Sequence, residues 1–163
     1  MPLKTYTFQQ DNNYMADTKD KDSIKPLYDQ LLPQLADKLY QQLTEVVPLF
    51  DDFSLERVAD TWTKDRDNPS DKPISLENGN VAQIGLKLQL LGFQRAGVTS
   101  FDIAKDLVLK LEHTTYSVGP DKNTTWVEKR YFQPWTPQEL DDVAERLASE
   151  VIDAITEQLR QNS

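Results

Sequence analysis

His113 is the only histidine in this 163-residue chain, and histidine is a common general base near neutral pH. A hydrolase would place such a base beside a nucleophile, but the sequence has no G-x-S-x-G motif to supply one. Alternation along a candidate strand sets His113 beside Leu109 and Leu111. The pattern therefore favours a structural or surface histidine, with a general base as the alternative.

Metal chemistry has little support in the sequence. There is no cysteine, and a single histidine cannot form a multi-histidine site. The loop that starts at Asp65 resembles a calcium loop only in part, because Ser70 stands at its sixth position and Leu76 at its twelfth. With 27 acidic residues, carboxylate pairs arise by chance. We therefore predict no catalytic residue, no metal site and no cofactor.

An aromatic and cationic run is the best binding candidate. Trp, Tyr and Arg often dominate protein interfaces. We predict partner binding by five residues of this run, namely Trp126, Lys129, Arg130, Tyr131 and Trp135. Two alternatives remain: one face of this strand packs on the C-terminal helix, or its rings stack on nucleic-acid bases. The acidic chain weakens the second alternative.

The charge balance limits the partners. The net charge is −9 and the pI is about 4.6, so the chain repels phosphate backbones and anionic lipids and tolerates basic partners. No segment approaches the roughly 20 apolar residues of a membrane span. The chain start has no apolar signal core, and cysteine is absent. We expect a cytoplasmic protein that binds a protein partner, for which a basic partner is one option, or that self-associates. The charge disfavours nucleic acid, and we expect no membrane.

Helical spacing of apolar residues dominates the first two thirds of the chain. Residues 23–47 carry a leucine stripe that Pro33 interrupts, which predicts two helices or one kinked helix. Ser54 can cap a short helix, and Asn80 can start another that Gly92 ends. Thr99 can cap a helical turn that runs into a strand near Leu107.

A β-hairpin is expected next. The strand from Leu107 continues to Val118, residues 119–123 form the turn, and residues 124–132 form the second strand. If Val118 pairs with Asn123, then Glu112 lies opposite Lys129 and Thr115 opposite Trp126.

The clearest local signal is a helix start at residues 135–140. Thr136 can cap the helix, Pro137 suits its first position, and Glu139 completes a capping box. An apolar stripe from Leu140 to Leu159 then predicts a helix that ends near Gln161 and has acidic outer faces.

These elements predict an α+β fold with three to five helices packed on an antiparallel β-hairpin. Residues 3–8 are a candidate N-terminal edge strand. We divide the chain into a flexible arm, residues 1–22, and one globular domain, residues 23–163. The missing catalytic motifs favour a non-enzymatic interaction, regulatory or assembly factor. The alternatives are a small hydrolase or metal-dependent enzyme that uses scattered carboxylates or His113, and an acidic inhibitor of nucleic-acid-binding enzymes.

Overall fold

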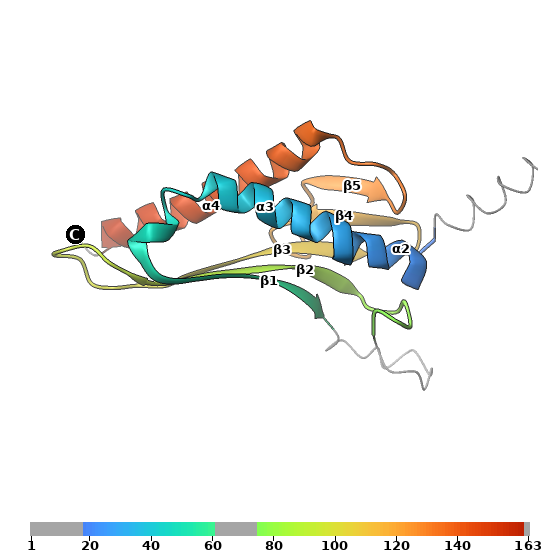
Figure 1. The fold of residues 1–163 in the computed structure, drawn as a ribbon, viewed down its shortest axis with the longest axis horizontal. Coiled ribbons are helices and arrows are strands. Elements are labelled where there is room, and N and C mark those ends of the chain that lie inside the picture. The colour runs from blue at the N-terminus through green and yellow to red at the C-terminus, as the bar shows by residue number, and fades with distance from the viewer. Residues whose placement is uncertain (1–17, 61–74, 162–163) are drawn as a thin grey trace, which may run out of the picture.

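Two helices cover one face of a five-stranded antiparallel sheet (Figure 1). The computed structural model describes residues 18–60 and 75–161. The strands follow one another in space as they do in the chain, in the order β1-β2-β3-β4-β5. The fold class is therefore α+β, as predicted, but the described part holds two helices rather than three to five.

The N-terminal helix is continuous. It comprises α2 (Lys21–Pro26), a π-helical turn η1 (Leu27–Leu31) and α3 (Leu32–Gln42). Asp20 and Ser23 form a capping box at its start. The π turn lies between the two prolines of the helix, where the ordinary hydrogen-bond ladder is interrupted. The sequence predicts either two helices or one kinked helix here, and the structure has a single helix.

Five strands and one more helix follow in the described chain. A 3-10 turn η2 (Val47–Leu49) leads into β1 (Phe50–Asp60), and β2 (Gln83–Phe93) pairs with it. The sheet continues with β3 (Ile103–Leu111), β4 (Thr115–Gly119) and β5 (Val127–Arg130). The long helix α4 (Pro137–Gln161) follows, with the bounds predicted from its capping box and apolar stripe.

Three predicted helices are wrong. The segments that begin at Ser54 and Asn80 form β1 and β2, and the predicted helical turn after Thr99 gives way to β3, which starts at Ile103. The alternating residues Ile84, Leu86, Leu88 and Leu90 are all buried, which is the period-2 pattern of a strand with one buried face. Burial against the helices outweighs the helix propensity of the leucines, lysine and glutamines in β2.

The predicted hairpin is wrong in part. Residues 112–114 divide the strand expected from Leu107 to Val118 into β3 and β4, and the hairpin of β4 with β5 has another register. Val118 pairs with Val127 instead of Asn123, and Lys129 lies opposite Tyr116 instead of Glu112. Gly119 explains the wider connection, because a Cβ on Gly119 would lie 1.8 Å from the carbonyl oxygen of Thr124. The connection folds back over this glycine before β5 begins.

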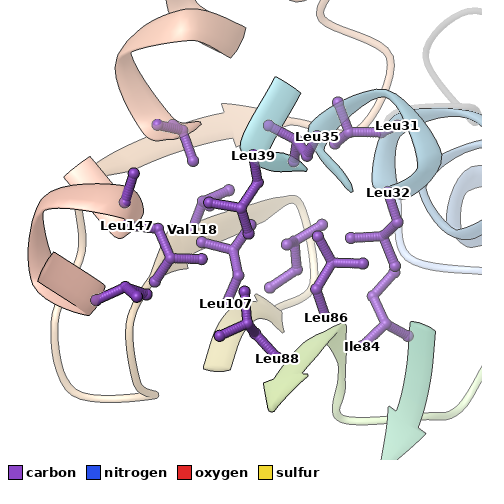
Figure 2. Close-up of a cluster of buried hydrophobic side chains, with 14 of the residues drawn as sticks. Leu31, Leu32, Leu35, Leu39, Ile84, Leu86, Leu88, Leu107, Val118 and Leu147 are labelled. Atoms are coloured by element: carbon purple, nitrogen blue, oxygen red, sulfur yellow. The ribbon is translucent and has the colours of Figure 1, made fainter. Parts of the chain in front are cut away.

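The core lies between the helices and the sheet. Figure 2 shows Leu35 and Leu39 of α3 and Leu147 of α4 gathered around side chains of the central strands, such as Leu86 and Leu107. The α3 and α4 helices also pack on each other. The opposite face of the sheet carries exposed charged residues, among them Glu56, Lys87 and Asp106 in one cross-strand row.

Several predictions fall on residues outside the described ranges. They are the candidate strand at residues 3–8, the loop at residues 65–73 and most of the expected arm. The helix starts at Lys21, so the last two residues of the predicted arm are helical. Within residues 18–60 and 75–161, no helix combines the length and apolarity that a membrane crossing requires.

Candidate functional site

The start of α4 is built as its sequence predicts. The Thr136 hydroxyl accepts a hydrogen bond from the Glu139 backbone N–H at 3.1 Å, and the Thr136 N–H donates to Glu139 Oε1 at 2.9 Å. This reciprocal capping box satisfies two N–H groups that a helix end would otherwise leave unpaired. It fixes the point at which the chain turns from β5 into α4.

Glu139 also holds Lys129, the most buried charged side chain of the described residues. Lys129 is 4% exposed, and its Nζ donates to Glu139 Oε1 at 2.8 Å and to the Pro134 carbonyl oxygen at 3.1 Å. The ammonium also lies 5.5 Å from the centroid of the Trp135 ring. The hydrogen bond from Lys129 is the main reason why the pKa of Glu139 is lowered.

Two tyrosines extend this polar cluster into the sheet. Trp135 Nε1 donates to the Tyr116 hydroxyl at 2.7 Å, and the Tyr131 hydroxyl donates to the Glu112 carbonyl oxygen. Both tyrosines are buried, with ring centroids 5.5 Å apart. Burial raises the pKa of Tyr116 to about 12 and raises that of Tyr131 as well. Both hydroxyls therefore stay protonated at neutral pH and serve as fixed hydrogen-bonding groups.

The five predicted binding residues thus divide between interior and surface. Lys129 and Tyr131 are buried, and Trp135 is half-buried with its N–H engaged. Trp126 is half-buried, and Arg130 is exposed. The alternative weighed from the sequence is that one face of this strand packs on the C-terminal helix, and Lys129 fits it through its contact with Glu139 of α4. Partner binding by the run stays a prediction, which Trp126 and Arg130 are best placed to serve.

Trp126 opens onto a cavity in the described part of the protein. This cavity, the Trp126 groove, has a volume of about 470 Å³. Its remaining lining comes from α4 and consists of Asp142, Glu145, Arg146, Ser149 and Glu150.

The Trp126 groove combines an aromatic wall with an excess of carboxylates. The Arg146 guanidinium lies 5.9 Å from the centroid of the Trp126 ring, within the range of a cation–π contact. Glu150 forms a long ion pair with Lys105 at 3.9 Å, and Asp142 accepts a hydrogen bond from Gln138 at 2.8 Å. The groove therefore carries three carboxylates and one guanidinium of its own, a composition suited to a cationic ligand.

Sequence reasoning found Trp126 but missed the α4 side of the groove. The acidic residues of α4 were treated as a solvated helix face. Their spacing of three or four residues does place Asp142, Glu145 or Arg146, and Ser149 on one stripe. The position of Trp126 beside that stripe depends on tertiary packing, which no local pattern reports.

A second cavity gathers the single histidine. His113 lies in the turn between β3 and β4 rather than in a strand, and it lines a cavity of about 360 Å³ together with Lys110 and Lys122. No hydroxyl nucleophile lines this cavity. Across the described parts of the chain, no cluster of histidine and carboxylate side chains is suited to a metal ion.

Comparison of the chain with protein-family models, with curated proteins and with solved structures finds no match.

Proposed function

We propose that this protein is a non-enzymatic interaction factor that binds a basic segment of a partner protein in the Trp126 groove. The supporting observation is the half-buried Trp126 ring at a groove whose α4 wall carries Asp142, Glu145 and Glu150. A cytoplasmic location is part of this proposal and rests on the absence of cysteine from the chain.

The internal contact of Arg146 indicates which cation suits the groove. A guanidinium already lies over the Trp126 ring, and Arg146 is exposed, so an arginine from a partner can compete for the same face. An exposed cation–π contact contributes about 0.5–1 kcal/mol, which is modest alone. Specificity comes from combining the ring with nearby carboxylates, because arginine can satisfy both at once.

Charge complementarity should act chiefly on the association rate. An acidic protein attracts a basic segment over a distance of about one Debye length, and that attraction weakens as salt is added. The ring contact is short-range and less sensitive to salt. The contribution of the ring contact to the binding free energy should therefore persist at physiological ionic strength, where charge attraction alone is weakened.

Isothermal titration calorimetry with a short arginine-rich peptide tests the proposal. Trp126→Ala should weaken binding about two- to fivefold at physiological salt, which corresponds to the roughly 0.5–1 kcal/mol of an exposed cation–π contact. The double change Asp142→Asn and Glu145→Gln should weaken it at least as much. A matched control, Glu56→Gln, removes an exposed carboxylate from β1, outside the groove. If the control and the groove variants lost the same affinity for the peptide, binding would be unspecific charge attraction, and the proposal would be overturned.

A further inference from the structure

We infer that the cavity at His113 is a binding site for a small molecule that carries a phosphate group. We call it the His113 pocket and define it by its lining residues, Ala82, Gln83, Lys110, Leu111, Glu112, His113 and Lys122. Its volume of about 360 Å³ is within the range of small-molecule sites. It shares no lining residue with the Trp126 groove, so this inference is independent of the proposed function.

The three basic side chains reach the His113 pocket from different elements. Lys110 is the second-last residue of β3, His113 lies in the β3–β4 turn, and Lys122 lies in the β4–β5 connection. Convergence of separate segments distinguishes the pocket from a run of lysines along one exposed helix.

Backbone contacts hold the segments that carry His113 and Lys122. The carbonyl oxygen of His113 accepts a hydrogen bond from the Lys19 N–H at 2.7 Å, which joins the turn to the start of the N-terminal helix. Around Lys122, the Asn123 N–H donates to Asp121 Oδ1 at 2.8 Å, and Asp121 forms an isolated bridge with Thr124. Both segments are therefore fixed before a ligand arrives, which lowers the entropic cost of binding.

The basic side chains of the pocket have no charged partner among the residues that the structure describes. Among residues 18–60 and 75–161, no ion pair or side-chain hydrogen bond engages Lys110, His113 or Lys122. By contrast, Lys38 pairs with Asp141 at 3.2 Å, and Lys129 pairs with Glu139. In a chain with 27 acidic and 18 basic residues, unpaired lysines at one cavity are available to bind an anion.

The composition of the pocket indicates the ligand class. Two ammonium groups can offset the two charges of a phosphate monoester, and the imidazole adds a hydrogen-bonding group. Glu112 is the one carboxylate in the lining and leaves the pocket cationic. Leu111 and Ala82 add apolar surface, which suits a phosphate attached to an apolar group. A long polyanion is disfavoured because the whole chain has a net charge of −9.

NMR on the full chain gives a direct test, because one histidine yields one set of imidazole signals. Phenyl phosphate should shift the His113 ring resonances saturably and bind more tightly than inorganic phosphate at the same ionic strength. Equal affinities for the two ligands would mean that the pocket recognises the phosphate charge alone. That result would overturn the inference that the apolar surface of the pocket contributes to binding. Sodium chloride at matched ionic strength should give no saturable shift.

Variants separate the pocket from the rest of the surface. Lys110→Ala and Lys122→Ala should each raise the Kd for phenyl phosphate about tenfold. Lys87→Ala is the matched control, because Lys87 is an exposed lysine of the neighbouring strand β2 and does not line the pocket. All three lysines are exposed, so the variants should fold, which circular dichroism checks. No saturable shift in the unmodified protein, or equal weakening by Lys87→Ala and Lys122→Ala, would overturn the site.

Discussion

Glu139 serves two structures with one carboxylate. It closes the capping box of α4 with Thr136, and it also accepts the hydrogen bond from the buried ammonium of Lys129. Lys129 in turn bonds the Pro134 carbonyl in the chain between β5 and α4. The end of the sheet and the start of the helix are therefore joined through one acid and one base.

This arrangement predicts a pH-dependent stability. The pKa of Glu139 is lowered from 4.5 in the folded protein, first by the hydrogen bond from Lys129. A lowered carboxyl pKa stabilises the fold above the ordinary value, and that contribution is lost as the pH falls through the folded value. Glu139→Gln should therefore destabilise the protein at pH 7, and the difference from the unmodified protein should shrink below about pH 4.5.

Urea unfolding at several pH values measures this effect. The control is Glu157→Gln, because Glu157 lies on the same helix and makes an exposed pair with Arg160. Exposed pairs contribute little, so the control should stay close to the unmodified protein at every pH. A constant difference between Glu139→Gln and the unmodified protein from pH 7 to pH 3 would contradict the prediction.

At the scale of elements, α4 was predictable because its signals are local. The capping box, the proline at the first position and a long apolar stripe all lie within the helix itself. β2 was not predictable in this way. Ile84 and Leu88 fit both a helical and an alternating pattern, and only the partner strands decide between them.

The hairpin register shows a related difficulty. Opposite charges on Glu112 and Lys129 suggested one pairing, but Lys129 finds its acid in α4 instead. Thr124 lies close to Gly119, and this contact makes the connection between β4 and β5 longer than the predicted turn. The sequence alone does not show that the two residues approach each other. The candidate site was also predicted only in part. The sequence indicated Trp126, but the acidic wall of the Trp126 groove arises from the docking of α4.

The apolar face of α4 predicts an order of mutational effects. Leu147 is 1% exposed, so Leu147→Ala should destabilise the fold by roughly 2–5 kcal/mol through lost contacts and a cavity. Thr136→Ala removes a cap and should cost roughly 0.5–2 kcal/mol. Ile152 is 46% exposed on the same helix, and Ile152→Ala should have the smallest effect.

Chemical denaturation of the three variants tests this order. The Ile152 variant controls for the loss of a large aliphatic side chain from the same helix. If Leu147→Ala left the free energy of unfolding unchanged, the packing of α4 on the sheet would be refuted.

At the scale of the whole molecule, the negative charge dominates. Several ion pairs are partly or fully exposed, such as Lys25 with Glu77 and Arg57 with Asp29, and contribute little individually. Because the net charge is −9, the negatively charged side chains repel one another in the compact folded state. Raising sodium chloride from 0.01 M to 0.15 M shortens the Debye length from about 30 Å to about 8 Å and should therefore raise the urea midpoint.

The groove variant provides a control for this salt effect. Asp142→Asn combined with Glu145→Gln removes two negative charges, so its midpoint should rise less with salt. A midpoint of the unmodified protein that falls with added salt would instead mean that attractive ion pairs outweigh the repulsion.

The strand order has a consequence for how the chain folds. Each strand pairs only with its neighbours in sequence, so the sheet requires the closure of one hairpin at a time. The helix pair is different, because α3 and α4 stand near opposite ends of the described chain and pack on each other over one face of the sheet that the segments between them form. Closing so long a loop is entropically expensive and slow relative to local pairing. We therefore expect the docking of the two helices to come last, and their separation to be the first step of unfolding, which a ligand that binds only the native Trp126 groove would oppose.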